Sequence, residues 1–447
     1  MHWRICCLPV IAGIQLCAAT TLAQFGNPGI GNPGGVQIDP QGVVRTLQLR
    51  KEAPAAVRKR QQEFLKEKLP PEIIVHTERR VISLRELDQR VHQQLEAEGE
   101  LDESLLALCG LNRIDEILID LPSRDILLVG PAGGYAPDGA GRRRNVQNGS
   151  PPLLLDDLVV GLRAAWQSDP QIGCSIDPLP ENMARFQNYL AQNAVATSVA
   201  AAAQRYQRMA ELLGYQEISV WGVPESSHAA LVLVEADLRM KRISIGNDPS
   251  GVKGIPSQLA LLKPQGNSLQ RWWFVPDYAP IQTDADRTWF SLSGPRLKLL
   301  AQEEYTNAAG QRFDAAATRP SVEEFARRFT EHYSELAEQQ PVFAELRNLF
   351  DAAVVGAVLR RERLCERSGC DLPTLMKDER LPRQRYPVAK TVHSTSQTRM
   401  VGNVMLGLVG GVSLDPRPVL RFEPRATELA PTRPLPPGDG LFQDHGK

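Results

Sequence analysis

The clearest pattern of hydrophobic and polar positions lies in the middle of the chain, at residues 217–256. Side chains alternate over 218–223 as they do in a strand, where successive residues point to opposite faces. Pro224 ends this pattern because it cannot donate a ladder hydrogen bond. From 228 to 242 the apolar residues follow helical spacing. The stretch therefore predicts a strand, a turn and a helix around which the rest of the chain packs.

Two pairs of opposite charge lie on this helix, Glu235 with Arg239 and Asp237 with Lys241. Residues four positions apart are neighbours on a helix surface. Asp237 and Lys241 belong to a helix that otherwise has a buried pattern, and buried charges are costly unless they are paired. We therefore interpret them as an internal ion pair that fixes the helix over a sheet, and keep a ligand-facing role as the alternative.

The flanking patterns predict an α+β or α/β fold, with a mixed sheet near 116–303 covered by helices. Alternating segments at 116–121 and 125–129 suggest a hairpin with one solvent-facing side. Downstream, a long antiparallel helix pair is expected within 321–366, broken at Pro341. This pair should pack against the sheet.

The glycine-rich segment 130–145 follows the predicted hairpin and contains three consecutive arginines, Arg142, Arg143 and Arg144. Its glycines do not match a phosphate-binding frame that opens a helix. We expect an exposed loop with a solvated run of charge. Binding of an anion is the alternative.

Residues 1–23 have the pattern of a secretory signal: Arg4, then a short apolar run, then a small-residue cleavage site at 21–23. The run is shorter than the ~20 residues that a membrane span requires, so a removable signal is favoured over a retained anchor. The later apolar stretch 401–414 is short and contains four glycines. We expect no transmembrane span after signal removal, and a periplasmic or extracellular location.

Composition divides the chain into six segments. The 447 residues leave room for two or three domains. In order, we expect a signal peptide at 1–23, a Gly/Pro-rich linker at 24–41, a charged and mostly helical region at 42–110, a core α/β domain at 111–370, an irregular segment with terminal strands at 371–414, and a Pro-rich disordered tail at 415–447.

Charge and cysteine content narrow the chemistry. The net charge of −1 gives no reason to expect a nucleic acid partner. Four cysteines follow the signal, and in an oxidising compartment they permit two disulfides; we expect Cys365–Cys370 and Cys109–Cys174, with buried free thiols as the alternative. There is no CxxC, and no two histidines share a helical face, so we expect neither a metal nor another cofactor.

Several phrases in the sequence resemble one family. They are WGVP at 221–224, EADLRMKRISIG at 235–246, VKGIPS at 252–257, QRWWFVPDY at 270–278 and FTEHYSELAEQQPVFAELRNLFD at 329–351. Over about residues 110–365 the chain resembles a domain of unknown function found in secreted bacterial proteins. The resemblance implies a fold unit and an exported setting, and it brings no activity.

Two further groups could contact a ligand. Trp272 and Trp273 straddle a predicted strand, so one ring can enter the core while the other faces outward, where it could stack on a sugar or a peptide. The alternative is that the helix pair covers both rings. Asp277 follows them at a turn and is retained as a candidate.

The case for catalysis depends on four residues. Ser257 with Lys253 could attack an acyl group if burial lowered the lysine pKa, and His228 with Asp237 could act as an oriented base. Neither pair has a GxSxG or HExxH frame. Ser257 is better explained as a helix cap, and His228 as a surface or capping residue.

We therefore predict a non-catalytic, extracytoplasmic binding or scaffolding module without a cofactor, whose partner is an unidentified envelope protein. A hydrolase that uses the Ser257, Lys253, His228 and Asp237 neighbourhood is one alternative. A purely structural envelope protein is another. The hydrolase requires His228, Asp237 and Ser257 around one cleft, and this geometry decides the matter.

Overall fold

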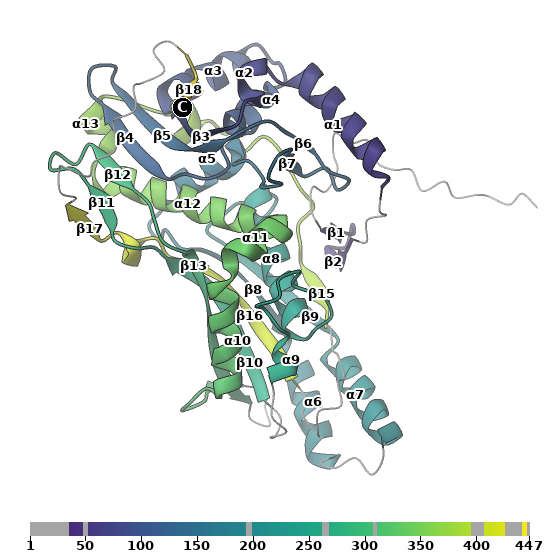
Figure 1. Cartoon of the computed structure of the whole chain (residues 1–447). Helices are drawn as coiled ribbons and strands as arrows, with labels where there is room; N and C mark the ends of the chain where they lie inside the picture. Colours follow the sequence, from purple (N-terminus) through teal and green to yellow (C-terminus); the bar gives the residue numbers. More distant parts are fainter. Residues whose placement is uncertain are drawn as a thin grey trace, which may run out of the picture. The chain divides into compact units, whose positions relative to one another are not determined.

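The computed structural model describes residues 35–47, 52–193, 199–261, 268–306, 311–394, 406–424 and 440–444. Residues Asn32–Lys447 fold as one unit. The segment Met1–Gly31, which includes the predicted signal peptide, lies outside the described residues. The predicted α+β or α/β fold with mixed sheets covered by helices is confirmed (Figure 1).

The larger sheet of the described residues, sheet A, has nine strands in mixed directions. Most neighbours are antiparallel, while β10 with β16 and β15 with β2 are parallel. Across the sheet the strands are β1 (Val36–Ile38), β2 (Val43–Thr46), β15 (Thr391–His393), β9 (Tyr215–Trp221), β8 (Ile172–Pro178), β16 (Leu406–Leu414), β10 (Ser268–Asp277), β13 (Arg296–Thr306) and β14 (Arg312–Asp314).

The second sheet, sheet B, is built around the predicted hairpin, here β4 and β5. All eight residues of β5 are buried, so the hairpin has no solvent-facing side along this strand. Across sheet B the strands are β17 (Phe422–Pro424), β11 (Ile281–Thr283), β12 (Trp289–Ser291), β4 (Glu116–Asp120), β5 (Asp125–Ala132), β3 (Thr77–Ser83) and β18 (Phe442–Asp444).

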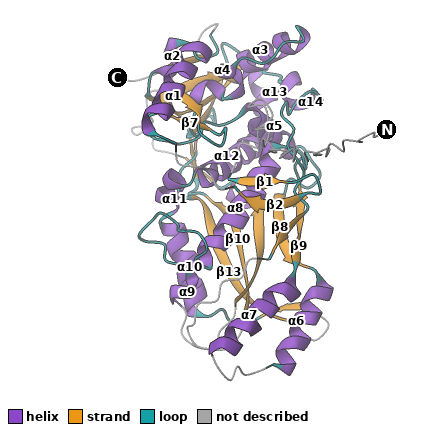
Figure 2. Cartoon of the chain, turned by 90° about the vertical axis from the view of Figure 1, so that its right-hand side faces the viewer, coloured by secondary structure: helices purple, strands orange, loops and turns teal. Residues whose placement is uncertain are grey.

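Helices α5, α8 and α12 form the centre of the unit. Helix α8 covers one face of sheet A, and α12 contacts both α8 and α5. Figure 1 shows α12 between the sheet B elements and α8, and Figure 2 places α6 and α7 at one end of the sheet A strands. The helices of the first half are α1 (Pro54–Lys68), α2 (Pro71–Ile74), α3 (Leu84–Glu96), α4 (Glu103–Leu106), α5 (Leu155–Ala164), α6 (Pro180–Gln192) and α7 (Val199–Leu213).

The remaining helices include the region predicted as a long pair. They are α8 (His228–Ser244), α9 (Gln258–Leu261), α10 (Pro320–Glu331), α11 (Tyr333–Gln339), α12 (Pro341–Arg361), α13 (Leu364–Ser368) and α14 (Pro373–Lys377). Helix α10 packs on β13, whereas α12 packs on α5 and α8. The first predicted helix is divided into α10 and α11, and it meets the second through α11, which packs on α12, and through Phe329, whose ring lies 5.6 Å from that of Phe343.

Local sequence explains the two central helices. Ser227 precedes α8, and its hydroxyl accepts the Ala230 N–H at 3.2 Å, which satisfies one of the unpaired donors of the first turn. Helix α12 starts with Pro341, is apolar on all sides and is buried nearly throughout. Helices α12 and α5 approach closely at two glycines, where a larger residue does not fit. A Cβ atom on Gly161 would lie 2.7 Å from the Ala352 backbone, and one on Gly356 would lie 2.8 Å from the Gly161 carbonyl oxygen.

The C-terminal part of the chain departs from expectation. The apolar stretch 401–414, part of the segment expected to contain terminal strands, gives the strand β16 over its described part, and β16 lies inside sheet A between β8 and β10. The Pro-rich tail, expected to be disordered, contributes β17 and β18 to sheet B. An ion pair explains why β18 joins sheet B: the buried guanidinium of Arg80 donates to the two carboxylate oxygens of Asp444 in this strand, at 2.7 and 2.9 Å.

The two predicted disulfides are wrong in this structure, where all four cysteines are free thiols. Cys109 lies in the hydrophobic core of sheet B and Cys174 in that of sheet A, so they cannot pair. Cys365 and Cys370 stand at the two ends of the turn that closes α13, where the Cys370 N–H donates to the Cys365 carbonyl at 3.1 Å. Burial raises the pKa of the Cys370 thiol to about 12.

We expected no membrane span after removal of the signal segment 1–23, which lies outside the described residues. Within residues 52–377, where the described helices lie, no helix combines the length and apolar character that a bilayer span requires.

Candidate functional site

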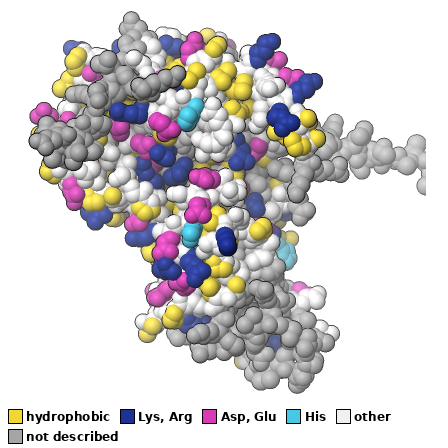
Figure 3. Space-filling view, viewed as in Figure 1, with side chains coloured by type: hydrophobic (Ala, Val, Ile, Leu, Met, Phe, Trp, Pro, Cys, Tyr) yellow, Lys and Arg dark blue, Asp and Glu magenta, His cyan; other side chains and the backbone are white. Residues whose placement is uncertain are grey.

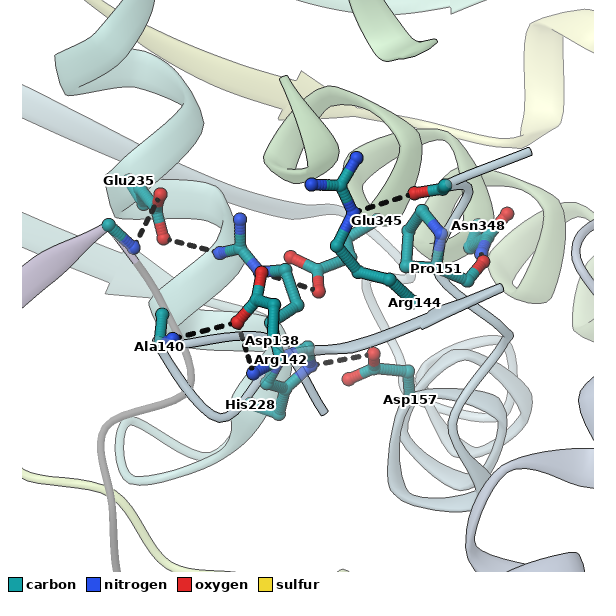
Figure 4. A network of polar contacts seen from close by, with 12 residues as sticks. Asp138, Ala140, Arg142, Arg144, Pro151, Asp157, His228, Glu235, Glu345 and Asn348 are labelled. Carbon is teal, nitrogen blue, oxygen red and sulfur yellow. Dashed lines mark hydrogen bonds and ion pairs between the residues drawn. The ribbon is translucent and has the colours of Figure 1, made fainter. Parts of the chain in front are cut away.

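The most unusual chemistry of the described residues is a buried group of charges where α5, α8 and α12 meet, which we call the central polar cluster (Figure 4). Its members are Arg142, Asp157, His228, Glu235 and Glu345, all buried. They come from the β6–β7 hairpin, from the N-terminal turns of α5 and α8, from the middle of α8 and from α12. The hairpin strands are β6 (Tyr135–Pro137) and β7 (Arg143–Asn145).

Arg142 is the cation of the cluster. Its Nη2 donates to Glu235 Oε2 at 2.8 Å, and its Nε lies 3.0 Å from Glu345 Oε1. Asp138 shapes the turn that presents this arginine, because its carboxylate accepts the backbone N–H groups of Ala140 and Arg142. Burial disfavours the guanidinium charge, but the two glutamates outweigh burial and hold the pKa of Arg142 above its usual value.

The arginine run is therefore not the solvated surface that the sequence suggested. Besides Arg142, Arg143 forms an ion pair with Glu103, and Arg144 donates to the Gly149 carbonyl at 2.8 Å. The glycine-rich segment is folded as the β6–β7 hairpin, and its first part, 130–136, is buried. Internal carboxylates hold the guanidinium groups of Arg142 and Arg143, and a backbone carbonyl accepts from that of Arg144.

Glu235 connects α8 to the N-terminal end of the described chain. Its Oε1 accepts the Gly35 backbone N–H at 2.9 Å, next to β1, while its Oε2 accepts from Arg142. Arg239, one turn further along α8, lies 3.9 Å from the same carboxylate. One buried side chain thus joins three segments that are distant in sequence.

His228 is also buried, although the sequence suggested a surface or capping residue. Its Nδ1 lies 2.8 Å from Asp157 Oδ2, and its ring packs against Tyr386 with centroids 5.7 Å apart. Burial lowers the pKa of His228, and the attraction of Asp157 more than offsets this, so the pKa is raised. The pair joins the first turn of α8 to the first turn of α5.

Glu345 is the least stabilised charge of the cluster. Burial raises its pKa to about 7, and the nearby Arg142 and His228 offset burial only in part. Buried oxygens of three side chains, Glu345 Oε2, Asp157 Oδ1 and Asn348 Oδ1, accept no hydrogen bond from the described residues. The cluster is therefore short of donors, which favours a proton on one carboxyl group.

The cluster is suited to joining elements more than to bond chemistry. It lines neither of the cavities described below. The hydroxyl-bearing ring of Tyr386 packs on His228, and burial raises the pKa of that hydroxyl well above its usual value. Among the residues that the structure describes, no three His, Cys, Asp or Glu side chains are grouped as a metal site would need.

The Asp237 and Lys241 pair lies further along α8 and is independent of the cluster. Lys241 Nζ donates to Asp237 Oδ2 at 2.9 Å and to the Ile176 carbonyl of β8 at 3.0 Å. Burial raises the pKa of Asp237 to about 6 although Lys241 opposes the shift. This arrangement is the architectural ion pair that the spacing suggested, since it fixes α8 on sheet A.

The structure does not bring the hydrolase residues together. Asp237 follows His228 by nine positions, about 13 Å along a helix axis, and each has a different partner. Ser257 and Lys253 line an open cavity of about 610 Å³ near the C-terminal end of α8. The geometry that the hydrolase interpretation requires is absent from these residues.

Our sequence reasoning overlooked one catalytic frame in the same cavity. Ser250 and Lys253 have the Ser-x-x-Lys spacing of some acyl-transfer enzymes. The Ser250 hydroxyl, however, is buried and lies within hydrogen-bonding distance of the Val252 and Ile255 carbonyls, at 2.9 and 3.0 Å. It is held by the turn that it stabilises, and Lys253 projects outward from a loop.

The tryptophan pair straddles β10 as expected. Trp272 is fully buried against Phe325 of α10, with ring centroids 5.4 Å apart. Trp273 is half-buried on the opposite face of sheet A, with the Arg271 guanidinium 4.7 Å from its ring. Asp277 contacts Lys298 on the neighbouring strand at 3.2 Å.

The second cavity, about 420 Å³, lies beside β9 and was not foreseen; we call it the β9 groove. At one end the Ile218 N–H donates to the Lys390 carbonyl at 2.8 Å, and at the other the Tyr386 N–H donates to the Ser226 carbonyl at 2.8 Å. Between these bonds the two chain segments diverge. The lining residues are Ile38, Glu217, Ile218, Ser219, Val220, Glu225, Ala230, Leu231, Val234, Pro387, Val388, Ala389 and Lys390.

The fold and these features define an α/β protein with two open sheets, an internal polar cluster and a groove at a strand edge. Within it, residues 174–258 match a family described as "Protein of unknown function (DUF1598)". The match supports the resemblance to an uncharacterised family over a shorter span than 110–365. It contains the β9 side of the groove, His228 and Glu235, while Arg142 and Glu345 lie outside it.

No curated protein has significant similarity to the chain. No solved structure has significant similarity to it.

Proposed function

We propose that this protein is an exported, non-catalytic binding module that presents the β9 groove to a protein partner outside the cytoplasm. The groove has the size of a ligand site, about 420 Å³. Residues from α8, namely Ala230, Leu231 and Val234, give it an apolar floor, and the exposed Glu217 and Glu225 lie at its rim. The groove is the observation that carries the proposal.

The other charged groups of α8 support the same proposal because they have internal partners. His228 is held by Asp157, Glu235 by Arg142, and Asp237 by Lys241. A catalytic group must reach a substrate, and these groups face the interior. The hydrolase alternative has no assembled set of residues, and the structural-protein alternative gives no account of an open groove.

The visible surface agrees with a protein partner. On the face shown in Figure 3, side chains of both charges are interspersed and hydrophobic side chains are scattered. A stripe of one sign, such as nucleic acid binding requires, is not present among the described residues on this face.

A pulldown from the envelope fraction tests the proposal. Mature protein beginning at Gln24 is immobilised beside two variants, Val388→Trp, which fills the groove, and Val75→Trp, which adds the same ring at an exposed site between α2 and β3 that does not line the groove. We expect a partner that the wild type and Val75→Trp retain and Val388→Trp loses. Equal recovery by all three proteins, or none above background, contradicts the proposal.

Export is tested separately by intact mass of the protein recovered from the periplasm or medium of expressing cells. We expect the mass of a chain that lacks residues 1–23. Full-length protein confined to the cytoplasm contradicts export and leaves the groove proposal to the pulldown.

A further inference from the structure

We infer that the β9 groove recognises an extended peptide segment that carries a lysine or arginine side chain. The inference rests on the proposed function and names the chemistry of the partner. Three features carry it: an open strand edge, an apolar floor and an excess of negative charge at the rim.

The strand edge follows from the hydrogen-bond pattern of β9. In an antiparallel pair, the N–H and C=O groups of alternate residues point to the same side. The Ile218 N–H donates to the Lys390 carbonyl. The backbone N–H and C=O of Val220, two residues further along β9, therefore also point to this side, toward the groove. None of the backbone hydrogen bonds of the described residues joins Val220 to the segment 387–389, and Pro387 has no N–H to donate.

These edge groups suit a peptide in extended conformation. Main-chain donors and acceptors on a strand edge pair with an added strand, and side-chain pockets beside the edge then select its sequence. Because Ile218–Lys390 and Ser226–Tyr386 contacts close both ends of the groove, the opening admits a short segment and one long side chain. A continuous long strand would have to break these two hydrogen bonds.

The floor and rim select the side chain. Ala230, Leu231 and Val234 form an apolar surface along which the methylene stem of a lysine or arginine can lie. Glu217 and Glu225 are exposed at the rim, against the single base Lys390. Neither glutamate forms an ion pair with a described residue in the structure, so both carboxylates are available to a cationic tip.

Binding of three labelled pentapeptides to the mature protein tests the inference by fluorescence anisotropy. The probes are Ac-Thr-Val-Lys-Val-Thr-amide, its Met variant, which keeps an unbranched stem without charge, and its Glu variant. We expect the Met peptide to bind about tenfold more weakly than the Lys peptide and the Glu peptide more weakly still. Equal affinity of the Lys and Met peptides, or preference for Glu, overturns the inference.

Variants of the rim provide the matched control. Glu217→Gln with Glu225→Gln should weaken the Lys peptide about tenfold and leave the Met peptide unchanged. The pair Glu323→Gln with Glu335→Gln, at exposed positions of α10 and α11, should change neither. If the rim variant loses binding of both peptides, its fold is damaged, and circular dichroism identifies this case. Competition by spermidine for binding to the wild type then tests the inference. Displacement of the Lys peptide alone supports the inference, and no displacement overturns it.

The two levels of proposal can fail separately. If the pulldown partner depends on the groove but none of the peptides binds, the binding-module proposal stands and the peptide inference is wrong. If the wild type instead dimerises at high concentration and Val388→Trp does not, the occupant is a second copy of the chain, which also overturns the peptide inference.

Discussion

Two buried arginines, Arg80 in strand β3 of sheet B and Arg142 in the central polar cluster, show two different uses of an internal charge. Arg80 is fully buried and donates to the carbonyls of Ile73, Cys109 and Val75, and to both carboxylate oxygens of Asp444. Arg142 is held mainly by two buried carboxylates. Apart from the Asp444 carboxylate, which is partly exposed, the acceptors of Arg80 are neutral backbone carbonyls.

The charge balance separates the two sites. Among the five members of the cluster, Arg142 and a protonated His228 face the carboxyl groups of Asp157, Glu235 and Glu345, so full ionisation leaves one excess negative charge within these five. Arg239, at the edge of the cluster 3.9 Å from Glu235, is itself paired with Asp248 at 3.1 Å. A proton on Glu345 restores balance, in agreement with its pKa of about 7. The Arg80 site is a fixed anchor for the C-terminal strand β18, whereas the cluster is a joint whose charge depends on pH.

Arg80→Met should cause the largest loss of stability. It leaves several buried carbonyl groups without a donor, each costing about 1–3 kcal/mol, so we expect a loss of at least about 4 kcal/mol in the free energy of unfolding. Urea denaturation measures it. The control Arg79→Met removes the neighbouring, half-buried contact with Glu116 at 3.0 Å and should cost about 1 kcal/mol or less. Equal losses of unfolding free energy for Arg80→Met and Arg79→Met would contradict the role of Arg80 as a buried anchor.

Arg142→Met should cost less, and its cost should depend on pH. Removing one partner of a buried ion pair typically costs about 3–5 kcal/mol. Here Glu345 can accept a proton, so we expect about 3 kcal/mol at pH 8 and a smaller loss at pH 5.5. Urea denaturation at the two pH values measures the difference. The Arg80→Met loss should be the same at both, and a pH-independent loss for Arg142→Met would remove the distinction between the sites.

Glu345→Gln should have the smallest effect near pH 6, where it mimics the protonated carboxyl group. The folded pKa of Glu345, about 7, lies above its ordinary value of 4.5, so the folded state holds a proton that the unfolded state has lost in that window. Stability therefore falls as pH rises from about 4.5 to 7, by about 3 kcal/mol. His228, whose pKa is also raised, adds loss in the same direction above about pH 6.5.

The measurement is the free energy of unfolding from pH 4.5 to 8 for the wild type, Glu345→Gln and the exposed control Glu335→Gln. Glu345→Gln should flatten the decline, while the control should follow the wild type. If all three curves coincide, Glu345 is ionised throughout and the cluster is a fixed anchor like Arg80.

Much of the fold was predictable where the signals are local. The helical spacing of α8, the cap at Ser227 and the Asp237–Lys241 pair all involve residues within a few positions of each other. The same is true of Ser83, which caps α3 by accepting the Glu86 N–H at 3.0 Å. Such patterns repeat with the helix and can be found in a single sequence.

The polar cluster was not predictable in this way. His228 and Asp157 are 71 positions apart and Arg142 and Glu235 are 93 apart, so no periodicity joins them. One signal existed: Glu345 stands in an apolar run that becomes the buried helix α12. A charge inside such a run indicates an internal partner, but the sequence alone does not say which segment supplies it.

The tail was misjudged for a related reason. Its proline-rich composition indicates disorder, yet Asp444 at its end has a buried partner in β3. Arg80 lies beside Val81 and Ile82 in that strand, and all three side chains are buried. An arginine within a buried strand requires acceptors from elsewhere: nearby carbonyl groups supply several of them, and the chain brings the carboxylate of Asp444 from more than 300 positions away.

The place of β16 has a consequence for how the protein is made. This strand separates β8 from β10, so sheet A stays in two pieces until residues near 414 have left the ribosome. Long-range pairing of this kind slows folding. During synthesis the growing chain therefore lacks the strand that joins the two parts of sheet A, and the facing edges of β8 and β10 stay without their partner until β16 is made.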